Sequence, residues 1–246
     1  MSLGDIYAKM KVRYNYFHYK LSGTKFLEEN WARRPSRDKS DWGDSKESWV
    51  EGYKESINHP HREYFIEQIS ACSPFCTVLE IGSNCGPNLY LLAKKFPSVQ
   101  FYGIDINTEA IEFGKRWFED EGINNIKLST GFADNLHDFL DNSIDVIFTD
   151  AILIYIGPDK IERVFSEFFR VAKNSIILCE WQNFNEDLPN TSYFDGNHWI
   201  YDYGGIVKKI YSEKDILISK LPQNLWNDKN WNRYGAIIKI MFRRNH

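Results

Sequence analysis

The spacing of apolar residues changes at about residue 77. Upstream of it, apolar side chains recur mainly at helical intervals, which predicts a broken helix over residues 5–31 and a helix over residues 45–53. Another helix is expected to begin at Pro60, because proline suits the first turn of a helix and apolar residues follow at core-facing spacing. The charged stretch over residues 33–39 predicts a solvated surface loop.

Downstream of that point, short apolar runs alternate with amphipathic segments. The runs predict strands over residues 77–81, 101–105, 126–129, 145–149 and 175–180, and the segments predict helices over residues 87–95, 108–121 and 160–171. Strands that alternate with helices are typical of a mostly parallel sheet covered on both faces. After a loop-rich section over residues 182–205, strands over residues 215–220 and 236–242 are expected to close the sheet edge as an antiparallel pair.

The composition fits a single folded core. The chain has 246 residues, of which 43% are hydrophobic and 26% are charged, with only 15 Gly and 8 Pro. One α/β domain with an added lid can absorb this length, and the balance excludes a disordered or collagenous chain. The longest apolar stretches are far shorter than the roughly 20 residues that cross a bilayer. Because the chain also starts without a basic and apolar leader, we expect no membrane span and a cytoplasmic location.

Charge and cysteine usage narrow the classes of partner. The net charge is −4 and the isoelectric point is about 5.9, so no global basic field would capture nucleic acid, and we expect none as a partner. Cys72, Cys76, Cys85 and Cys179 are too few and too scattered for a disulfide framework, and no further Cys or His pair completes a zinc site. We therefore expect free thiols and no metal. Nothing in the sequence indicates an oligomeric state.

Residues 80–86 follow the first strand of the alternating region and run directly into a helix, which is where open α/β sheets bind their ligands. Gly82 and Gly86 permit a tight turn and the close approach of a ligand, and Asn84 tolerates a positive φ. Asp105 ends the second strand, where a carboxylate can accept hydrogen bonds from both hydroxyls of a ribose. Asp134 follows the third strand, where it can accept one from an adenine amine.

Together these places form an adenosine site without a phosphate clamp. Taken singly, each has a structural explanation as well. The loop is also compatible with an ordinary strand-to-helix turn, and each aspartate with a helix cap.

Four motifs in this order resemble those of the class I S-adenosylmethionine-dependent methyltransferases. They are Val-Leu-Glu-Ile-Gly-Ser-Asn-Cys-Gly at residues 78–86, Gly-Ile-Asp at 103–105, Ala-Asp at 133–134 and Asp-Val-Ile-Phe-Thr-Asp-Ala-Ile-Leu-Ile-Tyr-Ile at 145–156. The resemblance is close over residues 60–181. It implies an α/β fold with a Rossmann-like, doubly wound, mostly parallel seven-stranded sheet, an N-terminal helical lid and an insert after strand five. The expected domains are a lid segment over residues 1–58 and a methyltransferase domain over residues 59–246.

The resemblance implies S-adenosylmethionine as the cofactor and a role for each motif residue. The glycine-containing loop would pass beneath the methionine part, Asp105 would hold the ribose, and Asp150 would present its backbone near the amino acid end. Residues 59–62, His-Pro-His-Arg, are similar to the Asn-Pro-x-Arg segment of ubiquinone-biosynthesis O-methyltransferases, so Arg62 is expected to pair with the cofactor carboxylate. Ala133 and Asp134 would frame the adenine, and Ile106 would pack on its face. The expected cofactor-binding residues are Arg62, Glu80, Gly82, Ser83, Asn84, Gly86, Asp105, Ile106, Ala133, Asp134 and Asp150.

The expected reaction is transfer of a methyl group to a small-molecule acceptor through a hydroxyl, with saccharides as one candidate class. In-line transfer from a sulfonium needs positioning more than a covalent intermediate, and a hydroxyl acceptor profits from a general base. The candidates are His198, Tyr155 and Asp150, followed by Glu180, Asp202 and Tyr203. His198 is preferred because an imidazole exchanges protons near neutral pH and lies here in an aromatic run. The expected lid residues are Trp42, Trp49 and Tyr53.

Two other classes of function stay open. A nicotinamide-dependent oxidoreductase would share the sheet and the acidic residue after strand two, but Asn84 and Pro87 stand where a dinucleotide fingerprint has glycine. A cofactor-binding protein that has lost the transfer chemistry would keep the same fold. Methylation of DNA-base amines is not expected, since residues 150–153 read Asp-Ala-Ile-Leu and not Asn-Pro-Pro-Tyr or Asp-Pro-Pro-Tyr.

Overall fold

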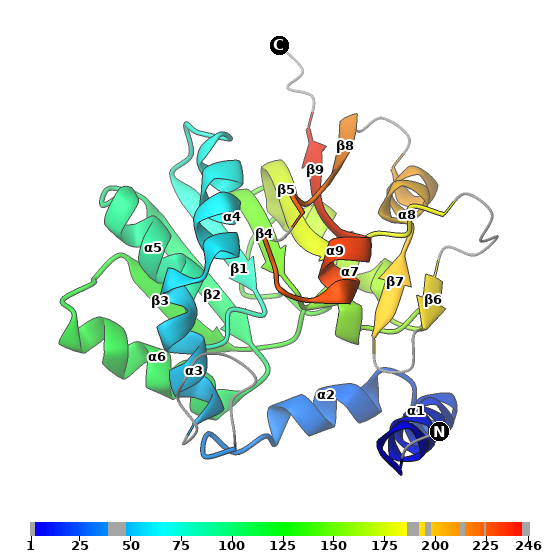
Figure 1. Ribbon diagram of the computed structural model, residues 1–246. Coiled ribbons are helices and arrows are strands. Elements are labelled where there is room, and N and C mark those ends of the chain that lie inside the picture. The colour runs from blue at the N-terminus through cyan, green and yellow to red at the C-terminus, as the bar shows by residue number, and fades with distance from the viewer. Residues whose placement is uncertain are drawn as a thin grey trace.

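A seven-stranded sheet runs through the centre of the protein (Figure 1). This computed structural model describes residues 3–38, 48–185, 192–194, 198–211, 215–223 and 225–242. The strands are β1 (Thr77–Ile81), β2 (Gln100–Asp105), β3 (Ile126–Thr130), β4 (Ile144–Asp150), β5 (Ala172–Trp181), β6 (Ser192–Phe194), β7 (Trp199–Tyr201), β8 (Asp215–Lys220) and β9 (Gly235–Met241). The α-helices are α1 (Leu3–Ser22), α2 (Lys25–Ala32), α3 (Trp49–Glu55), α4 (Pro60–Ser70), α5 (Pro87–Lys95), α6 (Thr108–Asp120), α7 (Ile161–Val171), α8 (Tyr203–Ile210) and α9 (Lys229–Tyr234).

The strand order of the large sheet is β3-β2-β1-β4-β5-β9-β8. The first five strands in this order are parallel, and β9 pairs antiparallel with both β5 and β8. The chain proceeds from β1 toward one edge and resumes at β4 on the other side of β1, so the order reverses between β1 and β4. Ligands of open α/β sheets bind outside the carboxyl ends of the strands at such a reversal.

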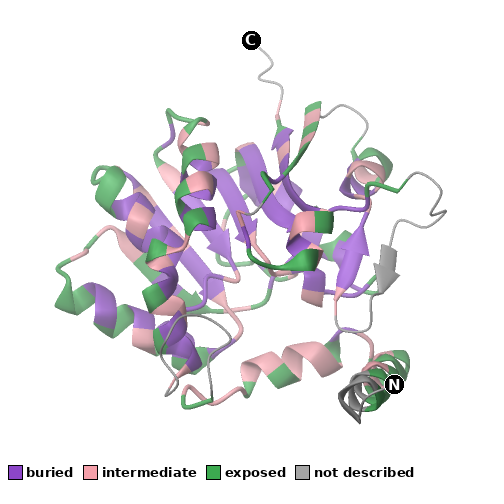
Figure 2. Cartoon of the chain, viewed as in Figure 1, coloured by how far each residue is buried: buried purple, intermediate pink, exposed green. Residues whose placement is uncertain are grey.

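Alternate residues of the central strands face two separate cores. Val78 and Phe148 lie in the core that α4, α5 and α6 cover, whereas Leu79 and Ile147 lie in the core that α7 and α8 cover. Figure 2 shows the central strands as almost wholly buried. Because both faces are covered, β1 and β4 read as nearly continuous apolar runs. The predicted doubly wound, mostly parallel sheet with an antiparallel closing pair is confirmed.

The N-terminal segment is fastened to the loop before α7. The broken helix predicted over residues 5–31 is two helices, α1 and α2, which are separated by Gly23 and Thr24. The backbone N–H and the hydroxyl of Thr24 donate to the Asp159 carboxylate over 2.9 and 2.6 Å, and the Tyr19 hydroxyl donates to it over 3.0 Å. These bonds join parts of the chain more than 130 residues apart. We call them the Asp159 clamp.

The section between β5 and β8 has more regular structure than its sequence predicted. It holds the β6–β7 pair and α8, and the connector between β8 and β9 holds α9. Neither of these helices was predicted. In the helix predicted over residues 45–53, residues 45–47 lie outside the described residues, and α3 begins at Trp49 after the capping hydroxyl of Ser48. Within the described parts of the chain, no helix has the length and apolar character to cross a membrane.

Candidate functional site

A cavity lies at the carboxyl ends of β1, β2 and β4, where the strand order reverses. Loops that follow the strands supply one side of it, and helices α2 and α3 supply another. Its lining consists of Glu28, Trp31, Trp49, Tyr53, Ile81, Gly82, Asn84, Ile104, Asp105, Ile106, Gly131, Phe132, Ala133, Asp150, Ala151, Ile152, Tyr155 and Ile156. The fold therefore brings the loop after β1, the end of β2 and the loop after β3 to one place.

The loop after β1 has the backbone that its residue types allow. Gly82, Asn84 and Gly86 have φ values of +76°, +52° and +87°, a region that glycine and asparagine tolerate best. A Cβ at Gly82 would come within 2.8 Å of the Ile152 side chain. The absence of a side chain here lets the loop pack against the segment after β4 and keeps the cavity floor open.

The Asp105 carboxylate ties the loop after β1 to the end of β2. It accepts the backbone N–H groups of Asn84 and Asn107, each over 2.8 Å, and it also lines the cavity. Burial raises the pKa of Asp105, while the bonds from these backbone groups act in the opposite direction. A carboxylate held by two donors in this way keeps a fixed orientation and has lone pairs left for a ligand.

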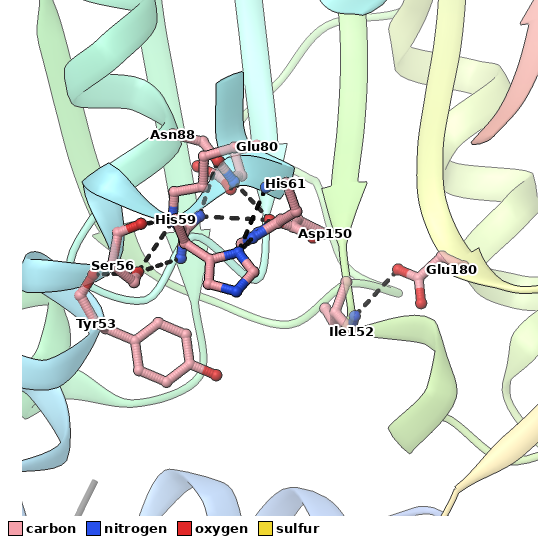
Figure 3. A network of polar contacts seen from close by, with 10 residues as sticks. Tyr53, Ser56, His59, His61, Glu80, Asn88, Asp150, Ile152 and Glu180 are labelled. Carbon is pink, nitrogen blue, oxygen red and sulfur yellow. Dashed lines mark hydrogen bonds and ion pairs between the residues drawn. The ribbon is translucent and has the colours of Figure 1, made fainter. Parts of the chain in front are cut away.

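A buried polar cluster surrounds Asp150 at the end of β4 (Figure 3). Asp150 Oδ2 receives the Asn88 amide over 3.0 Å and lies 3.2 Å from His61 Nε2 and 3.4 Å from an Arg62 nitrogen. Asn88 also donates to Glu80 over 2.7 Å and accepts from Arg62 over 2.8 Å. Asp150 Oδ1 is buried and accepts no hydrogen bond from the residues that the structure describes.

The electrostatics of this cluster keep Asp150 charged. Burial alone would raise its pKa, but His61 and the Arg62 guanidinium outweigh burial and lower the pKa to about 2. Burial lowers the pKa of His61 to about 4, so that Arg62 supplies the permanent positive charge. Burial raises the pKa of Glu80 well above its usual range. The cluster therefore places one ionised carboxylate at the cavity wall.

The segment after β4 is held from behind by Glu180. Ala151 has a φ of +60°, which is uncommon for a residue with a side chain. The Glu180 carboxylate accepts the backbone N–H groups of Ile152 and Leu153 over 3.0 and 3.1 Å and the Thr149 hydroxyl over 2.7 Å. Burial raises the pKa of Glu180 to about 8. These bonds fix the strained backbone that forms one wall of the cavity.

Aromatic side chains form the wall opposite the strand-end loops. The Trp31 ring lies 5.0 Å from that of Tyr155 and 6.2 Å from that of Trp49, whose indole N–H donates to the Pro35 carbonyl. The ring of Tyr53 lies 5.8 Å from that of Trp49. Of the predicted lid residues, Trp49 and Tyr53 are thus in the lining, and Trp42 lies outside the described residues.

Most of the predicted site residues form two groups, one in the cavity lining and one behind it. Gly82, Asn84, Asp105, Ile106, Ala133, Asp150 and Tyr155 line the cavity together. Glu80, Ser83 and Gly86 lie behind the lining: the first two are buried, and the Phe118 ring occupies the space beside Gly86.

Three residues have surroundings that the motifs did not indicate. Arg62 does not line the cavity, because its guanidinium faces Ser56, Asn88 and Asp150. The Asp134 carboxylate, expected at the adenine, is paired with Lys160 over 2.7 Å and with Arg163, and it too is absent from the lining. His198 lies behind Tyr155, with its ring 5.2 Å from that of Tyr155 and 4.7 Å from that of Trp181.

Several residues of the site were missed at the level of sequence. Trp31 and Glu28 reach the cavity because α2 folds across the strand ends, which nothing local in the sequence shows. His61 and Asn88 meet Asp150 although they are 89 and 62 residues away from it along the chain. Each of them lies in the first turn of a helix, His61 in the helix before β1 and Asn88 in the helix after it. This position is the only signal that could have indicated them.

Comparisons with known proteins agree with this geometry. Residues 78–175 match the family model described as "Methyltransferase domain". The chain is 28% identical over 153 residues to a protein-L-isoaspartate O-methyltransferase from Pyrococcus horikoshii, which covers 62% of this chain and 66% of that protein. It is 33% identical over 102 residues to a tRNA (guanine-N(7)-)-methyltransferase from Lactobacillus gasseri, which covers 40% of this chain and 47% of that protein. The chain thus spans less than two thirds of the length of these relatives.

The fold is shared with solved methyltransferase structures. A magnesium protoporphyrin IX methyltransferase from Synechocystis superposes with a TM-score of 0.62 at 14% identity, covering 89% of this chain and 97% of that one. At this identity the likeness concerns the fold. The family match and the shared fold confirm the class that the four motifs predicted.

Proposed function

We propose, from the premise that residues 78–175 are a methyltransferase domain on the class I S-adenosylmethionine-dependent fold, that this protein transfers a methyl group from S-adenosylmethionine to a small-molecule hydroxyl. The observation that carries the proposal is the convergence of Gly82, Asp105 and Ala133 on one cavity with an aromatic wall. We also assign residues 59–246 to the transferase domain and residues 1–58 to a lid.

The cavity fits the cofactor in three respects. Asp105 offers carboxylate lone pairs to the two ribose hydroxyls, and Ile106 and Ala133 offer apolar surface for an adenine ring. The buried Asp150 Oδ1, which has no donor among the described residues, suits the α-ammonium of the cofactor's methionine part. The floor at Gly82 has no side chain in the way. In this assignment Arg62 acts on the cofactor through Asp150, which it keeps ionised, rather than as a direct clamp.

The residues of the chain would supply positioning and a proton acceptor. When bound, S-adenosylmethionine supplies an electrophilic methyl group on a sulfonium. Trp31, Trp49 and Tyr155 cover the cavity and would exclude water from the acceptor, which they would hold in line. Asp150 is a poor proton acceptor because its pKa is so low. We assign to it the role of a negative charge beside the cofactor's α-ammonium. We assign proton acceptance to His198, which does not line the cavity and would receive the acceptor's proton through the hydroxyl of Tyr155, whose ring lies 5.2 Å from its own.

Ligand-induced stabilisation tests the cofactor. A ligand at about 100 times its dissociation constant adds roughly 2.7 kcal/mol to the free energy of unfolding, so S-adenosylhomocysteine should raise the melting temperature by several degrees. NADH at equal concentration serves as the control for the oxidoreductase alternative. A shift with NADH and none with S-adenosylhomocysteine would replace the proposal with that alternative. Binding without methyl transfer to any acceptor would favour a cofactor-binding protein.

The acceptor is tested by transfer of a radiolabelled methyl group. We expect label in small hydroxyl compounds, with saccharides in the first panel. The net charge of −4 supports this choice over RNA, although a tRNA methyltransferase is among the relatives. Label that enters total tRNA and not the small molecules would move the acceptor to nucleic acid.

The assignment of His198 is tested in the same assay. His198→Ala should lower turnover about 10²-fold or more and leave the affinity for S-adenosylhomocysteine nearly intact, as expected for the loss of a positioned proton acceptor. Trp181→Phe is the matched control, because it keeps an aromatic ring beside His198 at a residue outside the cavity lining. If turnover is unchanged in His198→Ala, the proton is accepted elsewhere.

A further inference from the structure

Helix α1 has an apolar stripe on its outer side. Its members are Ile6, Met10, Tyr14, Phe17 and Leu21, which are 39% to 68% exposed. At 100° per residue they fall within an arc of about 80° that extends along the whole helix. Single exposed apolar residues are ordinary, but a continuous row of five is a marked exposed patch. We call this row the outer stripe.

The opposite side of α1 is the side that faces the protein. Tyr19 lies there, with its hydroxyl in the Asp159 clamp and its ring 4.9 Å from that of Trp199. Val12 and Asn15, on the same side, are only partly exposed. Figures 1 and 2 show α1 at a corner of the molecule beyond α2, with its described outer surface exposed. With the clamp in place, the outer stripe faces away from the described core, apart from Tyr14 at its edge, whose ring lies 6.4 Å from that of Phe26 on α2.

Basic residues accompany the outer stripe. Lys9, Arg13 and Lys20 are exposed and lie along one flank of it. Residues 3–22 contain four basic residues and one acidic residue, although the chain as a whole has a net charge of −4. A partner that covers the stripe must therefore be apolar where the stripe lies and anionic beside it. A second α1 does not meet this description, because pairing would bring cations beside cations without acidic partners.

We propose that α1 docks the protein on the surface of an anionic phospholipid bilayer, with the outer stripe among the acyl chains and the basic flank at the headgroups. A helix of this length with an apolar face and a flank of Lys and Arg is typical of interfacial helices. Docking in the plane of the surface needs no membrane-spanning helix, and the described helices contain none. The proposal goes beyond methyl transfer, since it would hold for any chemistry in the cavity.

Docking would bring the cavity close to the bilayer. Helix α2 follows α1 after only Gly23 and Thr24, and its residues Glu28 and Trp31 line the cavity. A docked α1 would therefore hold the α2 wall at the membrane surface. An acceptor that partitions into the bilayer would then reach the cavity without crossing bulk water.

Co-sedimentation of the full chain with vesicles tests the proposal. We expect binding to vesicles of phosphatidylcholine with phosphatidylglycerol, weaker binding to phosphatidylcholine alone, and a loss of the difference at high salt. The double variant Met10→Glu with Phe17→Glu should weaken binding at least about tenfold, because each side chain contributes apolar burial. Leu140→Glu with Leu217→Glu is the matched control, since both leucines are as exposed but lie elsewhere. It should bind as the unchanged protein does.

The basic flank has a test of its own. Each of Lys9→Ala, Arg13→Ala and Lys20→Ala should weaken binding to the anionic vesicles about fivefold and leave binding to neutral vesicles unchanged. Melting temperature and S-adenosylhomocysteine affinity are measured on every variant, so that a misfolded protein or a failed cofactor assignment is recognised separately. The proposal is overturned if the folded protein ignores anionic vesicles. It is equally overturned if the protein is a dimer that the outer-stripe variant dissociates, because the stripe would then face a second copy.

Discussion

Asp105 illustrates how one side chain can serve both the fold and a ligand. Two backbone N–H groups hold its carboxylate, and the cavity takes the remaining lone pairs. Such a residue can bind hydroxyls without reorganising, because the orientation of its carboxylate is already set by the loop. The same bonds make the residue part of the strand-to-loop connection.

Asp105→Ala should therefore weaken binding of S-adenosylhomocysteine by roughly 1.5 to 3 kcal/mol, the range for hydrogen bonds to a charged group. Isothermal titration calorimetry measures this loss. Asp120→Ala on the exposed end of α6 is the control and should leave affinity unchanged. Equal affinity in Asp105→Ala and the unchanged protein would remove Asp105 from the ligand site.

At the scale of residues, the sequence was informative where function depends on local position. That Gly82, Asn84 and Asp105 lie together at the strand ends could be predicted, because each follows or ends a strand of the parallel sheet. The partners of Arg62 and Asp134 could not be predicted, since the fold brings them near from other parts of the chain. Asp134 pairs with Lys160, which directly precedes α7, and with Arg163 within α7. No spacing rule in the sequence shows that α7 comes near Asp134.

Among the elements, the segment after β4 depends most on a single buried group. Glu180 on β5 holds the N–H groups of Ile152 and Leu153, next to the positive φ of Ala151. The pKa of Glu180 is raised from 4.5 to about 8 by burial. Between these two values the folded protein keeps a proton that the unfolded chain releases. The stability due to Glu180 is therefore fully present below about pH 4.5 and is lost as the pH rises through 8.

Glu180→Gln removes this titration. In the unchanged protein, titration of Glu180 should lower the free energy of unfolding by something on the order of 3 kcal/mol between pH 5 and pH 8. The variant should lack this decrease. At pH 5 the variant should be less stable, because its amide cannot accept the Leu153 N–H. Urea unfolding across this pH range measures both effects. Parallel curves for the two proteins would contradict the assignment.

Elements were predictable where packing and local pattern agree. The bounds of β1 and α5 match the predicted ranges, because an apolar run and a proline start mark them. Helix α8 was missed because it begins Tyr203-Gly204-Gly205, and glycine disfavours helices. Tertiary contacts override that preference: Tyr203 packs on Phe165 of α7, with their rings 6.1 Å apart. Helix α9 was missed because it is short and lies in a Trp-rich stretch that was interpreted as a connector between the last two strands. It begins after Asp228, which caps it.

For the whole molecule, the Asp159 clamp is one of the attachments that keep the N-terminal helices over the cavity. The others include the ion pair between Lys160 and Glu28, the bond from the Gly157 N–H to the Thr24 hydroxyl over 2.8 Å and the bond from the Asn107 amide to the Trp31 carbonyl over 2.8 Å. The clamp is also pH-dependent. Hydrogen bonds from Thr24 and Tyr19 outweigh burial and lower the pKa of Asp159, so the clamp's stability is present above the ordinary aspartate range and is lost as pH falls through the lowered pKa.

Asp159→Ala should loosen the attachment of α1 and α2 while the sheet stays folded. Losing its three hydrogen bonds should lower the free energy of local opening by roughly 1 to 3 kcal/mol, which raises the rate of amide hydrogen exchange in α2. Amides of β4 and β5 are the internal control and should exchange as before. Faster exchange in those strands as well would mean that the substitution damages the whole domain.

The cavity lining comes from two parts of the chain whose sequences can vary separately. Gly82, Asp105 and Ala133 come from consecutive strand ends of the sheet, whereas Trp31, Trp49 and Tyr53 come from helices that precede the first strand. Exchange or insertion at those helices would leave the strand-end loops in place. Descendants of such a chain could diverge in what they modify while inheriting the same donor chemistry.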